Sequence, residues 1–241
     1  MAEGIVTYGE REAVDAALAA KQHDAYVAAL AGAGWAIHEV APADDLPDSA
    51  FIEDTVVACG DLAVIARPGA PQRRAEVAGT EESVRALGLD VARIEEPGTL
   101  DGGDVLAVGR TLYVGRGGRT NEEGIRRLAD LVASRGYDVV TVPLRDVLHL
   151  KSAITALPDG TIIAADPSLI DTAPLPAVRT VPEEAGSHVV PLGGDTVLMA
   201  ASAPRTAEQL ADAGLDVVAV DIGEFEKMEG CVTCLSVLVD R

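Results

Sequence analysis

Short apolar runs, glycine turns and amphipathic stretches follow one another along the chain in a repeated order. Short apolar runs bounded by Gly or Pro are typical of strands, whereas apolar residues at helical spacing are typical of an amphipathic helix. The order strand, turn, strand, helix, strand is clearest over residues 51–99 and again over residues 100–148. Such self-similarity predicts structural modules that pack against their neighbours.

We expect each of these two copies to form a ββαβ unit. In the first copy the predicted strands are Phe51–Cys59, Leu62–Ala66 and Val91–Glu95, and the predicted helix is Arg73–Leu87. In the second copy the predicted strands are Asp104–Val108, Leu112–Gly115 and Val139–Val142, and the predicted helix ends at about Ser134. Thr120 followed by Glu123 matches a capping box, so Thr120 is the predicted cap of that helix.

Two shorter copies and two end segments account for the rest of the chain. The third copy has predicted strands over 151–157 and 161–165, with a proline-rich stretch, 167–182, in place of a helix. The fourth begins at Val189 and contains a strand Thr196–Ala201, a helix Thr206–Ala213 and a strand Val217–Val220. The end segments are a helix from Glu10 to about Ala31, a strand Trp35–Val40, and a last strand Met228–Val239.

The repetition predicts the fold class. One ββαβ unit buries too little apolar surface to be stable alone, so neighbouring units have to pack around a common axis. We therefore predict an α/β protein with a radial, propeller-like arrangement, in which strand ends converge at the centre. No linker interrupts the pattern, so residues 1–241 are predicted to form one domain.

Composition and charge narrow the class of ligand. The chain is 48% hydrophobic, and its formal net charge is -20. Nucleic-acid binding requires clustered Lys and Arg, so this charge argues against such a partner. The charge fits a small cationic ligand, although a solvated acidic surface is the commoner cause of such a value.

The sequence also gives information on the cellular compartment of the protein. No apolar run approaches the roughly 20 residues of a membrane-spanning helix, and the N-terminus lacks the basic and then apolar pattern of a signal peptide. Three cysteines, an odd number, do not suggest a disulfide framework. We expect a cytoplasmic protein without a membrane partner, and the sequence leaves the oligomeric state, a homo-oligomer included, open.

Acidic residues lie near the start of the first strand in both clear copies. Glu53 and Asp54 stand inside an apolar run, where carboxylates need partners or a cation. Asp101 and Asp104 flank two glycines, a pattern that is also typical of a simple turn. In a radial fold these acids would face one central channel, whereas the alternative is a set of solvated strand ends.

Arginines precede the predicted helix in both copies, with Arg73 in the first and Arg119 in the second. Solvated surface is one interpretation, although an arginine at a helix N-terminus opposes the helix dipole. The matching placement suggests a shared role, such as holding a ligand carboxylate through paired hydrogen bonds.

The reactive side chains are His149, Cys231 and Cys234. Alternation along the predicted last strand would place the two cysteines on opposite faces, so that one points into a cleft while the other packs. A thioredoxin-type pair belongs at a helix N-terminus, and a structural zinc site needs further ligands at matching spacing, so both are disfavoured. His149 lies between two apolar runs and is either a satisfied core residue or, opposite a thiol, a general acid–base.

Six motifs in this order resemble the dimethylargininase (dimethylarginine dimethylaminohydrolase) family. They are FIEDT at 51–55, RPGAPQRR at 67–74, LDGGDVL at 100–106, GRTN at 118–121, LHLKS at 148–152 and TC at 233–234. Each motif is moderately specific, but six in register over nearly the whole chain are a strong match. The resemblance implies the pentein fold of the guanidino-group modifying enzymes, with five ββαβ units around a pseudo-five-fold axis.

The resemblance also implies roles in catalysis. Cys234 would be the nucleophile, and Cys231 would be non-catalytic. His149 would be the general acid–base, with Asp101 as its acidic companion.

Further residues would bind the substrate, again by resemblance. Asp54 would hold the guanidinium group, with Asp48 and Glu53 contacting the substrate or supporting that grip. Arg73 and Arg119 would bind the α-carboxylate, and the backbone carbonyl of Met228 would accept a hydrogen bond from the substrate.

The implied reaction is hydrolysis of asymmetric dimethylarginine or monomethylarginine to citrulline and a methylamine, through a covalent thiouronium on the cysteine. It needs no metal and no organic cofactor. The alternatives are an arginine or agmatine deiminase-like hydrolase, or a non-catalytic pentein-fold binding protein. Arginine deiminases resemble one another in an Asp two residues after the histidine, where this chain has Lys151. A non-catalytic member would lack the thiol, the histidine or the acids.

The N-terminus departs from the family pattern. Family members usually begin with a strand that ends in an arginine, ahead of a segment that covers the substrate. Here no such strand precedes the short segment Ile5–Thr7, of which Ile5 or Val6 is the expected covering residue. A missing strand would leave a neighbouring edge unpaired, so we predict that the natural chain starts upstream of Met1.

Overall fold

The structure, a computed structural model, describes residues 4–239, so Met1 and the prediction made for it lie outside that range. Its strands form four small sheets in this part of the chain. In every sheet the first two strands pair antiparallel and the second and third pair parallel. This pairing confirms the predicted ββαβ units, because a parallel pair requires a crossover connection.

The described part of the chain contains the following strands and α-helices. The strands are β1 (Val56–Cys59), β2 (Leu62–Ile65), β3 (Asp90–Arg93), β4 (Val105–Val108), β5 (Thr111–Arg116), β6 (Asp138–Pro143), β7 (Ile154–Ala156), β8 (Ile162–Ala164), β9 (Val178–Thr180), β10 (Val189–Gly193), β11 (Thr196–Ala200) and β12 (Asp216–Val220). The helices are α1 (Ala16–Gly32), α2 (Val77–Ala86), α3 (Glu122–Val132), α4 (Pro204–Asp212) and α5 (Gly223–Glu226).

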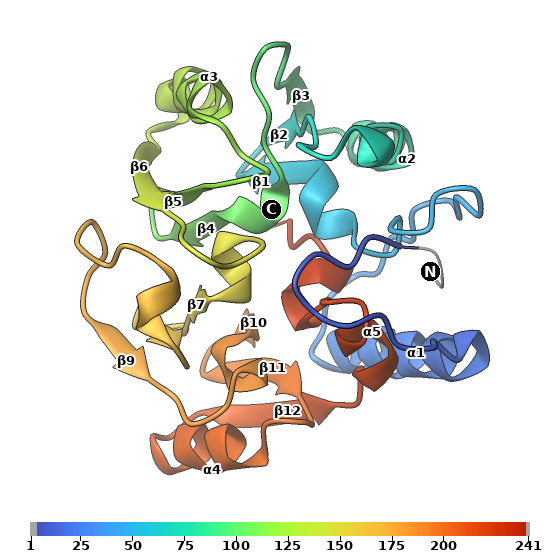
Figure 1. Cartoon of the computed structure of the whole chain (residues 1–241), viewed down its shortest axis with the longest axis vertical. Coiled ribbons are helices and arrows are strands. Elements are labelled where there is room, and N and C mark those ends of the chain that lie inside the picture. Colours follow the sequence, from blue (N-terminus) through green and yellow to red (C-terminus); the bar gives the residue numbers. More distant parts are fainter. Residues whose placement is uncertain (1–3, 240–241) are drawn as a thin grey trace.

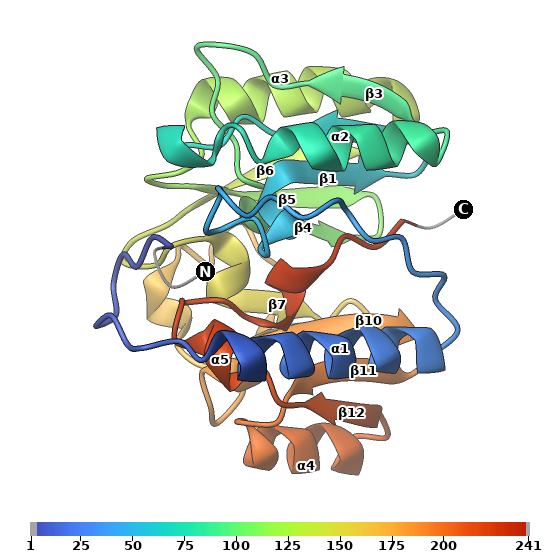
Figure 2. The same ribbon diagram turned by 90° about the vertical axis from the view of Figure 1, so that its right-hand side faces the viewer.

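The sheets are arranged radially. Figure 1 shows them around a common centre, with α1, α5 and the C-terminal segment in the remaining sector of the ring. In the perpendicular view of Figure 2, α2 and α3 lie at one end of the molecule and α4 at the other. The α/β class and the radial arrangement predicted from the repeats are confirmed. No helix among residues 4–239 is long and apolar enough to cross a membrane.

Apolar side chains fill the space between neighbouring units. Ile125 and Leu128 of α3 pack with Leu62 of the first sheet and Leu112 of the second. Helix α1 contributes Tyr26 to a cluster that includes strand β11 and the C-terminal segment. Each unit therefore completes the core of the next, as the repeat pattern requires.

Short 3₁₀ turns mark the inner end of the units. We call five of them the central turns: η1 (Ile52–Thr55), η3 (Gly102–Asp104), η5 (Leu150–Ser152), η7 (Ala185–Ser187) and η8 (Val232–Leu235). The first four run into β1, β4, β7 and β10, and the fifth runs into the extended Ser236. These turns bring polar residues to the axis, whereas the strands that follow them carry mainly apolar side chains.

Two predictions about strands are wrong at the central turns. Glu53 and Asp54 lie on η1 rather than inside a strand, which starts only at Val56. The predicted last strand, Met228–Val239, is also wrong, because Val232–Leu235 is a 3₁₀ turn and no strand follows β12 in the described residues. In both places β-forming residues adopt a 3₁₀ turn, since tertiary context overrides a short apolar pattern.

Other boundaries also differ from the sequence predictions. Helix α1 starts at Ala16 rather than Glu10, because Asp15 caps it by accepting hydrogen bonds from the amides of Ala17 and Leu18. The cap of α3 is Asn121, whose side chain accepts from the Gly124 amide, and not Thr120. Residues 35–40 form no strand, and the third unit contains β9, which the proline-rich stretch concealed.

Candidate active site

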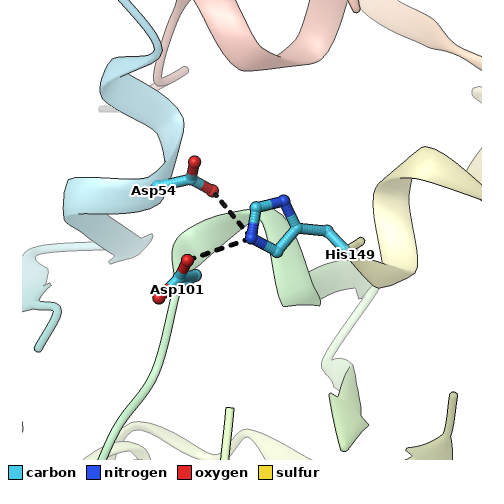
Figure 3. A group of neighbouring side chains, drawn as sticks. All are labelled: Asp54, Asp101 and His149. Carbon is cyan, nitrogen blue, oxygen red and sulfur yellow. Dashed lines mark hydrogen bonds and ion pairs between the residues drawn. The ribbon is translucent and has the colours of Figure 1, made fainter. Parts of the chain in front are cut away.

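Asp54 on η1 and the residues directly before η3 and η5, Asp101 and His149, come together in the interior. His149 Nε2–H donates to Asp101 Oδ2 at 3.0 Å and lies 3.7 Å from Asp54 Oδ1. Figure 3 shows both carboxylates approaching the same edge of the imidazole ring. Burial alone would lower the pKa of His149, but the charge of Asp54 and the hydrogen bond to Asp101 outweigh it and raise the pKa to about 9. The imidazole is therefore a cation at neutral pH.

Asp54 is held as an anion. The amide of Gly103 donates to Asp54 Oδ1 at 2.9 Å, and Arg73 forms a buried ion pair with Asp54 Oδ2. Burial raises the pKa of this carboxyl, but the charges of His149 and Arg73 lower it to about 2. A Cβ on Gly103 would lie 2.6 Å from Asp54 Oδ1, so only glycine permits this contact.

Asp101 connects the second unit to the same cluster. It is fully buried, and Oδ1 accepts from the Gly69 amide at 2.8 Å. Oδ2 faces both His149 and the guanidinium of Arg119, which is 3.5 Å away. Ligand atoms of Asp54, Asp101 and His149 all lie within 4.8 Å of one another, so these residues are also the group that could hold a metal ion.

The two arginines have different surroundings. The buried Arg73 guanidinium donates to Asp54, to both carboxylate oxygens of Glu76, and to the carbonyls of Asp48 and Phe51. Arg119 makes one long contact with Asp101 and one of 3.4 Å with the Thr7 hydroxyl. Arg119 therefore has hydrogen-bonding capacity left for a ligand, whereas most of the capacity of Arg73 is used within the protein.

A narrow cleft gathers most of the predicted site residues. Those that line it are Asp48, Asp54, Arg73, Arg119, His149, Met228 and Cys234. Asp101 lies against His149 beneath the cleft. The arrangement places a thiol, a cationic imidazole and buried carboxylates around one space, which suits attack on the carbon of a bound cation.

Cys234 is half-buried on the fifth central turn. A hydrogen bond with Cys231, burial, and the carboxylates of Glu53 and Asp54 raise the pKa of its thiol well above the usual value. A cation bound between these carboxylates and the sulfur would oppose the effect of the carboxylates and favour the thiolate.

Glu53 lies on the other side of the cluster. It accepts from Lys151 Nζ at 2.6 Å and from the Thr233 hydroxyl at 3.0 Å. Burial raises its pKa to about 7, although the charge of Lys151 opposes the rise. Glu53 and Lys151 also line a second, mainly apolar cavity of about 220 Å³ between the inner strands and the C-terminal segment. Neither Glu53 nor Lys151 lines the active cleft.

Glu229 is a site residue that sequence reasoning missed. Its backbone has a φ of 60°, and its carboxylate accepts from the amides of Thr7, Tyr8 and Gly9 at 2.5–2.7 Å. Consecutive amides around an anion fix the local backbone. Just before them, the amide of Ile5 donates to Asp48 Oδ1 at 3.1 Å, and Ile5 lines the cleft. Nothing in the sequence pattern marks Glu229, since its partners are more than two hundred residues away.

Comparisons with known proteins place the chain among one group of enzymes. It is 60% identical over 237 residues to an N(G),N(G)-dimethylarginine dimethylaminohydrolase of Streptomyces coelicolor, covering 98% of this chain and 92% of that protein. A crystal structure of a dimethylarginine dimethylaminohydrolase adduct with S-methyl-L-thiocitrulline has a TM-score of 0.90 and 34% identity, over 97% of this chain and 93% of the other.

A second solved structure agrees. A cysteine variant of the enzyme from Pseudomonas aeruginosa, in complex with citrulline, has a TM-score of 0.87 and 34% identity, over 95% of this chain and 91% of the other. A scan against family models gave no match. The fold class implied by the sequence resemblance is confirmed by these structures.

Proposed function

Because the chain belongs to the dimethylarginine dimethylaminohydrolase family, we propose that it hydrolyses N-methylated arginine to citrulline and a methylamine. The observation that carries this proposal is the cleft in which Cys234 and His149 meet the ionised carboxylate of Asp54. Nucleophile, proton donor and cation-binding group are the functions that the reaction requires.

The substrate would bind through its charges. The guanidinium group would lie against Asp54, which remains ionised at neutral pH because its pKa is about 2. Arg119 would bind the α-carboxylate directly. Arg73, whose guanidinium is mostly engaged, would contribute one further N–H and keep Asp54 in place. We retain Asp48 and the Met228 carbonyl as further contacts, since both residues line the cleft.

The chemistry would follow in two stages. The Cys234 thiolate attacks the guanidinium carbon, and His149, already protonated, transfers its proton to the departing methylamine. The thiouronium on Cys234 is then hydrolysed by water that the neutral imidazole activates, and citrulline leaves. Asp101 holds the imidazole by its hydrogen bond throughout and is a positioning residue in this scheme.

Lys151 supports a methylated substrate over free arginine. The family resemblance places a carboxylate at this position in arginine deiminases, where it would bind the unsubstituted end of arginine. Here the position carries a cation that is held 2.6 Å from Glu53. A substrate nitrogen that carries methyl groups needs no hydrogen-bond acceptor there.

A citrulline assay tests the proposal. Purified protein is given asymmetric dimethylarginine, monomethylarginine, arginine and agmatine side by side. We expect turnover of one or both methylated substrates, and poor turnover of agmatine, which lacks the carboxylate. Agmatine as the best substrate would instead indicate an agmatine deiminase.

The matched variants of that assay are Cys234→Ser and Cys231→Ser. Cys234→Ser should abolish citrulline formation because an alcohol is far less ionised than a thiol near neutral pH. Cys231→Ser should keep most of the activity. Equal loss in both variants would contradict the assignment of Cys234 as nucleophile.

We also retain two broader predictions as proposals, a cytoplasmic location and a single domain. The three cysteines are all free thiols, which suits a reducing compartment. Side chains from distant parts of the chain line one cleft, which suits one folding unit. Cell fractionation and a single cooperative unfolding transition are the respective tests.

A further inference from the structure

The fifth central turn places Cys231 and Cys234 side by side. In a strand these residues would point to opposite faces, but in a 3₁₀ turn side chains three apart lie above one another. Cys231 is the residue that caps the turn, its amide donates to Cys234 Sγ at 3.4 Å, and the two sulfur atoms are 3.3 Å apart. The two thiols are therefore in contact before any rearrangement.

The two sulfurs differ in their access to the cleft. Cys234 lines the cleft and is half-buried, whereas Cys231 is 6% exposed and does not line it. A small oxidant that enters the cleft therefore meets Cys234 first. Cys231 is placed to react only with Cys234, which is the relation between a peroxidatic and a resolving thiol.

The hydrogen bond between the thiols favours a single charge in the pair. It lowers the pKa of Cys231 and raises that of Cys234, so one proton is shared between the two sulfurs. The remaining cysteine, Cys59, is 1% exposed and does not line the cleft. An oxidant in the cleft does not reach it, so Cys59 supplies a control.

We propose that Cys231 and Cys234 form a reversible disulfide when a peroxide enters the cleft. Cys234 passes its proton to Cys231 across their hydrogen bond, and its sulfur attacks one peroxide oxygen; the O–O bond breaks, and Cys234 sulfenic acid and water form. Cys231 sulfur then attacks the Cys234 sulfur, the S–S bond forms, and the S–O bond breaks to release a second water. Two thiols are oxidised and one peroxide is reduced; a small dithiol reverses the reaction by exchange.

Such a disulfide has two consequences for the enzyme. It occupies the sulfur that the proposed function assigns as nucleophile, so activity stops while the bond persists. It also stops oxidation before the sulfinic acid, from which ordinary reductants do not recover a thiol. The loss of activity rests on the proposed function, but the formation of the disulfide does not.

Hydrogen peroxide treatment of the full-length protein tests the proposal. Peptide mapping should show a peptide with Cys231 and Cys234 joined and two hydrogens lighter, and thiol titration should show two thiols lost. Citrulline formation should fall in proportion and return with dithiothreitol. A protein that forms the disulfide yet has no initial activity would contradict the proposed function and leave the disulfide intact.

Two variants sharpen the test. Cys59→Ser should behave like the parent protein in every measurement. Cys231→Ser should retain activity before treatment, accumulate a dimedone-reactive sulfenic acid on Cys234, and recover less activity with dithiothreitol. The proposal is overturned if the parent protein itself accumulates oxygenated Cys234 without the cross-link, a result that needs no variant to fold. It is equally overturned if Cys231→Ser recovers as completely as the parent.

Discussion

The first two units contain the same parts at matching positions, yet they hold their arginines differently. In the first unit, from η1 to β3, Arg73 is buried with Asp54 and Glu76 in direct ion pairs. In the second unit, from η3 to β6, Arg119 faces Asp101 only at 3.5 Å, and its other contact, with Thr7, belongs to the N-terminal segment. One arginine is a fixed part of the protein, and the other is available to a ligand.

This difference shows how a repeated fold divides work between equivalent positions. A buried ion pair with several hydrogen bonds has a definite geometry, and removing one partner leaves an uncompensated buried charge. A loosely paired, partly exposed guanidinium can instead change partners at little cost. The first unit is thus suited to fixing a carboxylate, and the second to binding and releasing one.

The largest expected effect concerns His149, where the acids of both units meet. His149→Ala should lower citrulline turnover by about 10²–10⁴-fold, because it removes the general acid–base. Cys234 should still be alkylated by a reactive amidine, since attack on it does not require the imidazole. Mass spectrometry of the adduct and steady-state assays measure the two properties. Normal turnover in the variant would remove His149 from the mechanism.

Arg73→Ala should destabilise the protein by about 3–5 kcal/mol, as expected when one partner of a buried ion pair is removed. Asp54 and Glu76 would be left without their shared cation. Urea denaturation measures the loss, with Arg119→Ala as the matched control. If both variants unfold at the same urea concentration, the contrast between the two units is wrong.

Arg119→Ala should mainly raise KM, reducing kcat/KM by the equivalent of about 1.5–3 kcal/mol, the range for a hydrogen bond to a charged group. Its thermal midpoint should remain near that of the parent. A change in stability without a change in KM would show that Arg119 serves the fold rather than the substrate.

The pH dependence of catalysis tests how Asp54 and Asp101 contribute to the pKa of His149. Because the imidazole must be protonated to act as an acid and the bound substrate favours the Cys234 thiolate, kcat should fall about tenfold per pH unit above the pKa of His149, which is about 9 in the free protein. A raised native pKa also stabilises the fold below pH 6.5, and this contribution is lost as the pH rises through 9. Asp54→Asn and Asp101→Asn should each shift the alkaline limb to lower pH, since the charge of Asp54 and the hydrogen bond and charge of Asp101 all raise the pKa of His149. An unchanged limb in both variants would contradict this origin of the pKa.

The smallest expected effect is that of Thr7→Val, which removes the 3.4 Å contact with Arg119. This hydrogen bond is long and exposed, so water replaces it readily and KM should change only slightly. Steady-state kinetics beside the parent protein measures it. A loss as large as that of Arg119→Ala would mean that the N-terminal segment, and not the substrate, is the partner of Arg119.

The sequence predicts the repeated sheets well because their signals are local. Apolar runs such as Leu62–Ile65, bounded by glycine turns and followed by an amphipathic stretch, determine strand and helix without distant information. The motifs around Asp54, Asp101 and His149 likewise brought together residues that the structure places in contact. The roles assigned to them remain predictions.

The errors arise where distant partners decide the local structure. Residues 232–235 are strand-like in composition but form a turn, and Tyr26 of α1 donates to the Val232 carbonyl at 2.8 Å from two hundred residues away. Trp35–Val40 has no partner strand within residues 4–239, and its indole donates to the Leu192 carbonyl instead. The two environments of Arg73 and Arg119 depend on Glu76 and Thr7, which no repeat pattern links to them.

The central turns also bear on how the protein folds. Residues 54, 101, 149 and 234 lie on or directly before four turns spread over most of the chain, and they meet only when the ring is complete. Contacts between such distant residues have to be formed against loop-closure entropy, so folding is slow relative to that of a helical bundle of equal size. Local opening of the sector that carries any one of these residues separates that residue from the others. Activity is therefore a sensor of the integrity of the whole ring and would be lost before the secondary structure disappears.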